Sequence, residues 1–219
     1  MTESNVKYPN SNSQSGDKPP ASFSDRARGW SNRLVVPAAK ALGRLGLTPN
    51  GLTLIGLALI LVTAIVLALG HNVWGGVLFI VAGIFDALDG TLARVSDRKS
   101  RFGAFLDSTS DRYADAAILF GVMAPFLQKG QPTEVILAFI ALIGSMLVSY
   151  TRARAEGLGL ECKVGLLTRF ERFIIITIGL FFNLVTPMLW VMAVLTNVTA
   201  VQRIVYVWTI TRTSDAPKP

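Results

Sequence analysis

Six long apolar segments follow one another along this chain of 219 residues and constrain its fold more than any other feature. Hydrophobic residues make up 51% of the sequence and charged residues only 16%, a composition too apolar for an ordinary soluble domain. A helix needs about 20 mostly apolar residues to cross a bilayer. The six segments lie at about 51–70, 74–95, 103–127, 133–156, 170–187 and 188–210, and the last two are separated only by the turn signal NLVTP. We therefore predict an all-α integral membrane protein with six transmembrane helices.

Lysine and arginine residues are distributed unequally over the two sides of the predicted membrane. They are frequent before the first segment, between segments two and three, between segments four and five, and after segment six. The opposite side holds only Lys129. Because cytoplasmic loops carry an excess of Lys and Arg, both chain ends are predicted to lie on the cytoplasmic side of the cell membrane. The net charge of +7 then reflects topology and attraction to anionic lipid headgroups, and no nucleic-acid-binding module is recognisable.

The N-terminal part of the chain differs in composition from the six segments. Residues 1–21 contain almost no large apolar side chains and are predicted to form a disordered cytoplasmic tail. In residues 22–47 apolar side chains recur at helical spacing while Arg and Lys occupy other faces, which is typical of an amphipathic helix in the membrane interface. This segment is expected to form one or two helices, with a break near Pro37. The transmembrane domain then covers residues 48–210, and residues 211–219 form a C-terminal tail.

Four aspartates lie within this apolar context, in the stretch DALDGTLARVSDRKSRFGAFLDSTSD. Asp86 and Asp89 are separated by three positions, and Asp107 and Asp111 by four, so each pair shares one face of a helix. A short polar loop at 96–102 makes the two helices antiparallel neighbours, which brings the four carboxylates to one depth. Four carboxylates cannot stay ionised together in hydrocarbon without cations. Because their oxygen donors favour hard cations, we predict a site for two Mg²⁺ or Mn²⁺ ions that could clamp a pyrophosphate.

Small and basic residues beside the aspartates are consistent with a phosphate ligand. Gly90 allows a close approach to the helix backbone, Arg94 lies one turn further and can pair with phosphate, and Gly103 clears space on the face of Asp107. Alternatively, the carboxylates could form ion pairs with the nearby arginines Arg94, Arg98, Arg101 and Arg112. Four aspartates on two helix faces, together with two glycines, favour a functional site over this alternative.

The whole stretch resembles the complete signature of the CDP-alcohol phosphotransferases. The matching pattern is Asp86-x-x-Asp89-Gly90-x-x-Ala93-Arg94, then eight residues, then Gly103-x-x-x-Asp107-x-x-x-Asp111. The resemblance extends over about residues 22–210, because the family also has six spans and an interfacial N-terminal helix. It implies an enzyme in which a hydroxyl attacks the lipid-side phosphorus of a CDP-linked lipid and CMP leaves.

The resemblance also implies roles for individual residues. The metal ligands would be Asp86, Asp89, Asp107 and Asp111, and Asp111 would in addition be the general base. The CDP site would be lined by Thr53, Asp86, Gly90, Ala93, Arg94 and Gly103, with Thr53 contributed by the segment TPNGLT ahead of the first span. A homodimer is a further expectation from the family.

Arginines beyond the signature point to a phosphorylated acceptor. Four of them flank the loop between segments four and five, and Arg203 lies within an apolar stretch. Fixed cations of this kind suit a phosphate, although those near the loop could also be a topological flank. The segments SYTRARAEG, RFER and VQR resemble those of prokaryotic phosphatidylinositol-phosphate synthases, with Arg152 replacing Lys and Phe170 replacing Pro. This second resemblance implies that the phosphate of inositol phosphate is held by Ser149, Arg152, Arg172 and Arg203.

The predicted reaction transfers a phosphatidyl-type group from CDP-diacylglycerol, or an archaeal analogue, to inositol phosphate. The nearest alternative is a phosphatidylglycerophosphate synthase, which uses glycerol 3-phosphate and needs a phosphate site as well. A polyprenyl transferase also uses intramembrane aspartates, but its Asp-rich motifs differ. A divalent-cation transporter is an alternative of another class, and it would have no use for Arg94 and Gly90 beside the acids.

Overall fold

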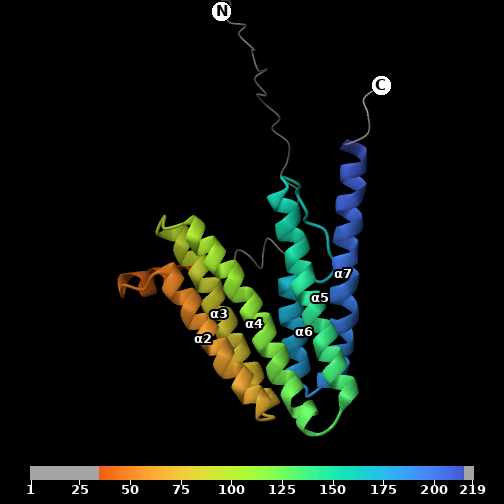
Figure 1. Cartoon of the computed structure of the whole chain (residues 1–219). Helices are drawn as coiled ribbons and strands as arrows, with labels where there is room; N and C mark the ends of the chain where they lie inside the picture. Colours follow the sequence, from red (N-terminus) through yellow and green to blue (C-terminus); the bar gives the residue numbers. More distant parts are fainter. Residues whose placement is uncertain (1–34, 215–219) are drawn as a thin grey trace, which may run out of the picture.

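The computed structural model describes residues 35–214, which form an all-helical fold (Figure 1). A short helix at 35–44 is followed by six further helices, which run alternately down and up. These are α2 (Pro49–Ala68), α3 (Asn72–Val95), α4 (Arg101–Gln128), α5 (Pro132–Gly157), α6 (Arg169–Phe181) and α7 (Val185–Ser214). Each of the six apolar segments of the sequence therefore corresponds to one helix.

The boundary between the last two predicted segments is wrong by several residues. The predicted fifth segment reaches residue 187, whereas α6 already ends at Phe181 and α7 begins at Val185. Asn183, in the connection, has a φ of 53°, a conformation that ends a helix and that Asn adopts more readily than most residues. The motif NLVTP does mark the turn, but Pro187 lies inside the first turn of α7, where proline is well tolerated.

Four helices are long and apolar enough to cross a membrane by length and composition: α2, α3, α5 and α7. Helix α4 has 28 residues, but its N-terminal half carries several charged side chains. Helix α6 has only 13 residues. The described part of the chain is thus compatible with a multi-pass membrane protein, while the crossing of the membrane by α4 and α6 stays a prediction.

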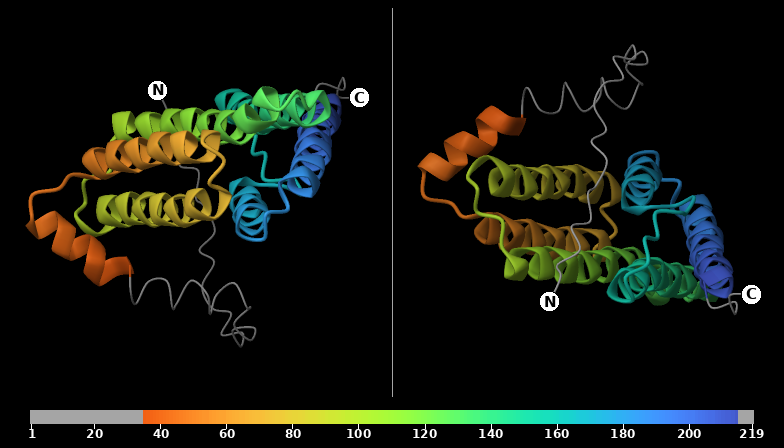
Figure 2. Two further views of the ribbon diagram at one scale, coloured as in Figure 1. Left: turned by 90° about the horizontal axis from the view of Figure 1, so that it is seen from below. Right: turned by 90° about the horizontal axis from the view of Figure 1, so that it is seen from above.

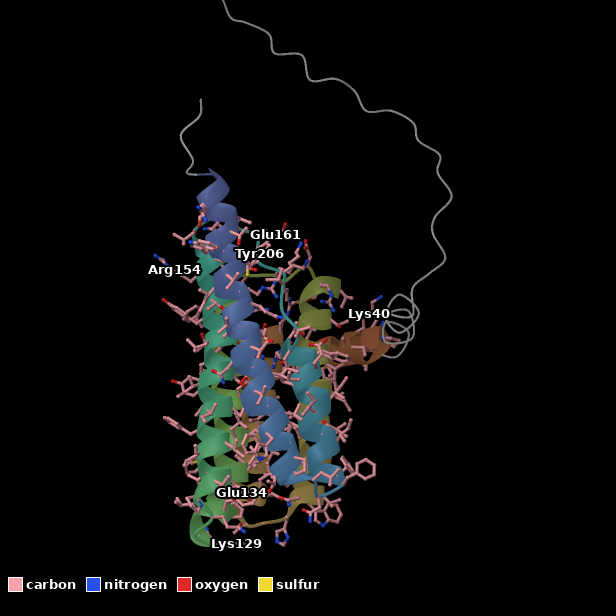
Figure 3. All side chains as sticks on the ribbon, turned by 90° about the vertical axis from the view of Figure 1, so that its right-hand side faces the viewer. Lys40, Lys129, Glu134, Arg154, Glu161 and Tyr206 are labelled. Atoms are coloured by element: carbon pink, nitrogen blue, oxygen red, sulfur yellow. The ribbon has the colours of Figure 1, made fainter. Side chains whose placement is uncertain are left out.

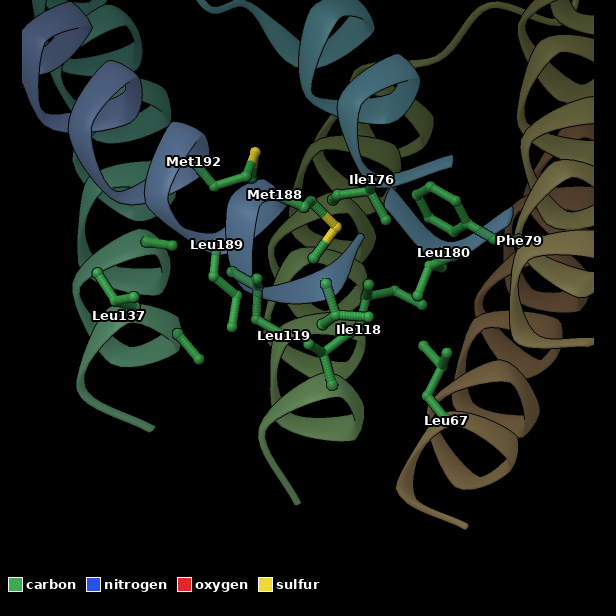
Figure 4. Packing of buried hydrophobic residues seen from close by; sticks show 14 of the residues in the cluster. Leu67, Phe79, Ile118, Leu119, Leu137, Ile176, Leu180, Met188, Leu189 and Met192 are labelled. Atoms are coloured by element: carbon green, nitrogen blue, oxygen red, sulfur yellow. The ribbon is translucent and has the colours of Figure 1, made fainter. Parts of the chain in front are cut away.

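The helices pack in two groups. Helix α2 packs against both α3 and α4 and lies between them, and α5 packs against α7 (Figure 2). Contacts of α4 with α5 and of α3 with α6 join the groups. Gly121 of α4 and Gly144 of α5 permit close helix contacts, because a Cβ atom at either position would overlap atoms of α2 or α7. The shared core consists of aliphatic, Phe and Met side chains, including Leu67, Phe79, Ile118, Leu119, Leu180, Leu189 and Met192 (Figure 4).

The short helix at 35–44 lies within residues 22–47, for which an interfacial amphipathic helix was predicted; its place in the membrane interface stays a prediction. Its residues Val35, Ala39 and Leu42 pack against the start of α2 and the end of α3, and Lys40 and Arg44 are exposed. Pro37 lies inside the helix, so the predicted break near this proline is not found in the described part of the chain. The tail at 1–21 and the first part of the amphipathic segment lie outside the described residues.

Charged residues gather at one end of the helices. Lys40, Arg154 and Glu161 lie toward the end that carries the 35–44 helix, whereas Lys129 and Glu134 lie at the opposite end (Figure 3). This arrangement agrees with the unequal distribution of Lys and Arg along the sequence, and it places the basic loops on the same side as the aspartates of α3 and α4.

Candidate active site

The four aspartates face one another across a space between α3 and α4. These two helices are antiparallel, as the short loop between them predicts, but they do not lie directly side by side because α2 separates them (Figure 2). The hydroxyl of Ser100 caps α4 by accepting a hydrogen bond of 2.9 Å from the backbone amide of Gly103. This cap defines the start of α4, a few residues before Asp107 and Asp111.

Three of the carboxylates converge tightly. Oxygen atoms of Asp86, Asp89 and Asp107 all lie within 4.8 Å of one another. Asp89 is buried, with 5% of its surface exposed, and the hydroxyl of Thr53 on α2 lies 2.6 Å from its Oδ2 atom. Asp111 lies within electrostatic range of Asp86 and Asp107 but outside this tight group. We call the four residues the acidic cluster; the convergence of three of them agrees with the predicted ligand set.

Arg169, at the start of α6, makes the shortest ion pairs with this cluster in the described chain. Its Nη1 and Nη2 atoms lie 3.1 and 3.0 Å from the two oxygens of Asp86, and Nη2 also lies 2.6 Å from Oδ1 of Asp111. In the sequence, Arg169 was one of the four arginines beside the loop between segments four and five, which point to a phosphorylated acceptor or to a topological flank; a pair with the aspartates was not predicted. The one available signal was its position three residues before Arg172, which puts both on one face of α6. Of the arginines expected as structural partners, Arg112 alone pairs with the cluster in the described chain, 3.6 Å from Asp111.

Two cavities meet at the acidic cluster. The first, of about 420 Å³, lies between α2, α3, α4 and α6; its polar end is formed by Asp86, Asp89, Asp111 and the arginines of α6, and its apolar part includes Ile60, Phe79 and Phe173. The second, of about 230 Å³, is lined by the start of α2, the end of α3, the loop after it and the start of α4. Thr53 and Asp89 line both cavities and so form part of the wall between them.

The residues predicted to bind CDP are divided between these cavities. The second cavity is lined by four of them, Thr53, Gly90, Ala93 and Gly103, and its rim also contains the basic residues Arg98 and Lys99. Asp86 lines the first cavity instead. Arg94 is exposed and lines neither one; its Nη2 donates a hydrogen bond of 2.9 Å to Thr91.

The arginines predicted to bind the acceptor phosphate lie near one another, but each is engaged by protein groups. Arg172 is 3% exposed, lines the first cavity and pairs with Asp115 at 2.8 Å. Arg203 is equally buried and donates from Nε to the Val164 carbonyl at 2.9 Å and from Nη1 to the Val148 carbonyl. Both Arg152 and Arg172 are within electrostatic range of Arg203.

Ser149 and Arg152 lie on α5, at the basic end of the molecule. Arg152 is half-exposed and pairs with Glu156 one turn later at 2.8 Å. Ser149 is half-buried. The first cavity is therefore lined directly by Arg172 but not by the other three predicted phosphate-binding residues.

Helix α7 fixes the loop 158–168 that leads into α6. Thr199 accepts a hydrogen bond of 3.0 Å from the Leu167 amide, and Gln202 accepts one of 3.3 Å from the Leu166 amide. Arg203 holds the same loop through Val164. The loop ends at Thr168, which caps α6 together with Glu171. The face of α7 that carries these side chains thus sets the position of the first turn of α6.

Comparison with known proteins identifies the family. The family model described as CDP-alcohol phosphatidyltransferase matches residues 46–209, which is most of the chain. This chain belongs to the CDP-alcohol phosphotransferase family. It is therefore an enzyme of phospholipid biosynthesis and not a cation transporter. Its family and its four apolar helices together indicate a multi-pass membrane protein.

Relatives within the family share much of the sequence. The archaetidylinositol phosphate synthase of Pyrococcus horikoshii is 42% identical over 166 residues, covering 75% of this chain and 86% of the relative. The phosphatidylinositol phosphate synthase of Mycobacteroides abscessus is 41% identical over 182 residues, covering 78% of this chain and 82% of the relative.

The phosphatidylinositol phosphate synthase of Mycobacterium tuberculosis has a similar solved structure. The form with CDP-DAG bound superimposes with a TM-score of 0.76 at 34% identity, covering 81% of this chain and 94% of that chain. The form in complex with manganese and citrate superimposes with a TM-score of 0.75, covering 80% and 90%. The family fold is thus shared along nearly the whole described chain.

The connection between α7 and the loop 158–168 generates a prediction for Cys162, the single cysteine, which is fully buried in this loop. A net hydrogen bond stabilises by about 0.5–1.5 kcal/mol, so Thr199→Val or Gln202→Leu should speed maleimide labelling of Cys162 about two- to tenfold. Labelling is measured well below the unfolding temperature, with the exposed α7 substitution Val205→Ala as the control. Rates equal to wild type in both variants would show that these side chains do not hold the loop.

Proposed function

We propose that this enzyme transfers a phosphatidyl-type group from a CDP-linked lipid to a hydroxyl of inositol phosphate, releasing CMP and forming a phosphatidylinositol phosphate. The observation that carries the proposal is the junction of the acidic cluster with a cavity whose polar end contains Arg169 and Arg172. A diphosphate donor needs the acids and their cations, and a phosphorylated acceptor needs the arginines. The names of two relatives agree, because both contain inositol phosphate while they differ in the lipid part.

The acidic cluster has the donor set expected for a hard divalent cation. The tight group offers three carboxylates and no His or Cys, and oxygen ligands of this type suit Mg²⁺ or Mn²⁺. Asp86, Asp89 and Asp107, with Asp111 as the fourth ligand, would hold two such ions. Bound ions would supply Lewis-acid stabilisation of the charge that develops on the diphosphate. The manganese complex of the M. tuberculosis relative supports this assignment.

We place the CDP part of the donor in the second cavity. Gly90, Ala93 and Gly103 present little side chain there, which leaves room for a nucleotide against the helix backbones. Thr53 fixes the orientation of Asp89 through its hydrogen bond. Arg94 lies one turn beyond Gly90 on an exposed face, from which its long side chain can reach a phosphate.

Asp111 is the residue we assign as general base. It lines the first cavity together with Arg169 and Arg172. Its carboxylate would take the proton of the acceptor hydroxyl as that oxygen bonds to the lipid-side phosphorus, and the bond from phosphorus to the CMP oxygen would break. The lipid phosphate is thereby transferred, and CMP leaves with the electron pair of the broken bond.

Ser149, Arg152, Arg172 and Arg203 are the residues we propose for the acceptor phosphate. Arg172 already lines the cavity, and Arg203 keeps further N–H donors beyond the two bonds it makes to carbonyls. Arg152 would leave Glu156, an exposed pair that stabilises by at most about 1 kcal/mol. Because this site lies at the basic end of the molecule, we propose that the site and both termini are cytoplasmic.

The acceptor assignment is tested by CMP release from CDP-diacylglycerol with different acceptors. Inositol phosphate should support release, while free inositol should support little, because it cannot use the arginines. Each charged hydrogen bond to phosphate is worth about 1.5–3 kcal/mol, so kcat/KM for free inositol should be lower by about 100-fold or more. Equal rates with free inositol would refute the phosphate pocket, and a preference for glycerol 3-phosphate would establish the sister reaction.

The base assignment is tested by Asp111→Asn. The variant should lose about 10²–10⁴-fold in transfer rate while CDP-diacylglycerol still binds, because an amide cannot accept the hydroxyl proton. Asp97→Asn is a matched control: Asp97 lies in the exposed loop after α3 with a φ of 52°, which Asn also tolerates. An Asp111→Asn variant within about tenfold of the wild-type rate would remove the base role from this residue.

A further inference from the structure

Arg169 makes a contact that the proposed chemistry does not by itself require. Its guanidinium lies between Asp86 and Asp111, one assigned as a metal ligand and the other as ligand and base. Both oxygens of Asp86 are engaged by the two terminal nitrogens of Arg169, in the bidentate arrangement typical of strong arginine–carboxylate pairs. One cation from α6 thus compensates charge on both α3 and α4.

This contact competes with a divalent cation for the same oxygens. A carboxylate that ligates a cation has less negative charge to offer the guanidinium, and the two positive charges repel each other. Engagement of Asp86 by a cation therefore weakens its pair with Arg169. Because coupling between two binding events is reciprocal, Arg169 must in turn lower the affinity of the cluster for that cation.

Arg169 has a second place to bind once its pair with Asp86 is weakened. Its side chain is 44% exposed, so it is not locked by packing, and it lines the first cavity together with Arg172 one turn further along α6. The ion pairs of Arg169 in the described chain are with Asp86 and Asp111, while Asp115 pairs with Arg172 and lies within electrostatic range of Arg169. A planar fork in this position is well suited to bidentate binding of a phosphate.

We propose that Arg169 couples the metal site to the acceptor site. It competes with the divalent cations for Asp86 and Asp111, and when the cations hold these two carboxylates the freed fork binds the phosphate of the acceptor. Metal and acceptor then bind cooperatively. The acceptor phosphate binds tightly only when divalent cations compensate the negative charge of the acidic cluster. This inference rests on the proposed function and adds a specificity residue that the family signature does not contain.

A purely structural role for Arg169 makes the opposite prediction. If Arg169 only holds Asp86 and Asp111 in the geometry that a cation needs, its removal disorders the ligands and weakens metal binding. If it competes with the cation, its removal strengthens metal binding. The sign of the change in metal affinity therefore separates the two roles without any measurement of turnover.

The first experiment titrates the purified full-length protein with Mn²⁺ and follows free Mn²⁺ by electron paramagnetic resonance. Arg169→Gln should bind Mn²⁺ more tightly than wild type, by about tenfold, within the usual range of coupling between sites. Arg169→Lys keeps the charge but cannot bridge both carboxylates, so its Mn²⁺ affinity should lie between those of wild type and Arg169→Gln. Unchanged or weaker binding by Arg169→Gln would overturn the competition.

Two controls carry the same loss of charge without touching the acidic cluster. Arg172→Gln removes a cation from the same helix, paired with Asp115 rather than with Asp86 or Asp111. Arg154→Gln removes an exposed cation at the end of α5. Salt screens the exposed Arg154, so its loss should change the Mn²⁺ affinity by less than about twofold, and loss of the buried Arg172, whose charge is compensated by Asp115, should tighten binding less than loss of Arg169 does. Equal tightening in all three variants would reduce the effect to net charge and refute a specific role for Arg169.

The second experiment measures binding of inositol phosphate by calorimetry, with Mg²⁺ or with EDTA. In wild type the affinity should be higher with Mg²⁺, whereas Arg169→Gln should lose about tenfold with Mg²⁺ and change little in EDTA, as expected for one charged hydrogen bond. An unchanged affinity with Mg²⁺ in this variant would overturn the acceptor contact. Absence of Mn²⁺ binding by the wild type would instead refute the proposed metal site, so the failure of the two proposals can be told apart.

Discussion

Mutual repulsion among the carboxylates of the acidic cluster is the interaction on which the rest of this structure depends. Asp86, Asp89 and Asp107 place oxygens within 4.8 Å of one another between apolar helices, where charge is costly. Two contacts reduce this repulsion: the Thr53 hydroxyl donates a hydrogen bond to Asp89, and the Arg169 guanidinium pairs with Asp86 and Asp111. The carboxylate oxygens are in addition suitable ligands for divalent cations. In the proposed reaction, the diphosphate of the donor and the phosphate of the acceptor meet beside the acidic cluster and its arginines.

The arrangement of the helices leaves the acidic cluster accessible from two cavities. Helix α2 packs on both α3 and α4 and holds them apart, so that two cavities reach the carboxylates from different sides. The first turn of α6 places Arg169 against Asp86 and Asp111. The position of this turn depends on the loop 158–168. That loop is in turn held by Thr199, Gln202 and Arg203 of α7. A helix without a residue in either cavity thus controls the cation that contacts the acids.

Local patterns in the sequence were sufficient to predict most of the helices and the acidic cluster. Apolar segments of about 20 residues identify helices because each must satisfy its backbone within the membrane. The spacing of Asp86 and Asp89 gives a shared face from helix geometry alone. The end of α6 was misplaced because the decisive event, the positive φ of Asn183, leaves no apolar signal.

Contacts between distant segments could not be predicted in the same way. Arg169 lies 83 positions from Asp86, and its spacing to Arg172 does not indicate that it pairs with the aspartates. Gln202 and Leu166 are likewise 36 positions apart. The placement of α2 between α3 and α4 also requires the tertiary structure, since the short loop at 96–102 is compatible with direct packing. These residues can be identified only from the tertiary structure, which brings the start of α6 to the cluster and α7 to the loop that precedes α6.

The most direct test of this account is the dependence of CMP release on a divalent cation held by the acidic cluster. CMP release from CDP-diacylglycerol with inositol phosphate is measured in EDTA and again after addition of excess Mg²⁺ or Mn²⁺, for wild type and for Asp107→Asn. The account predicts no release in EDTA, recovery of the wild type on addition of metal, and no comparable recovery of the folded variant. Full turnover of the wild type in EDTA, or wild-type recovery of Asp107→Asn, would contradict it.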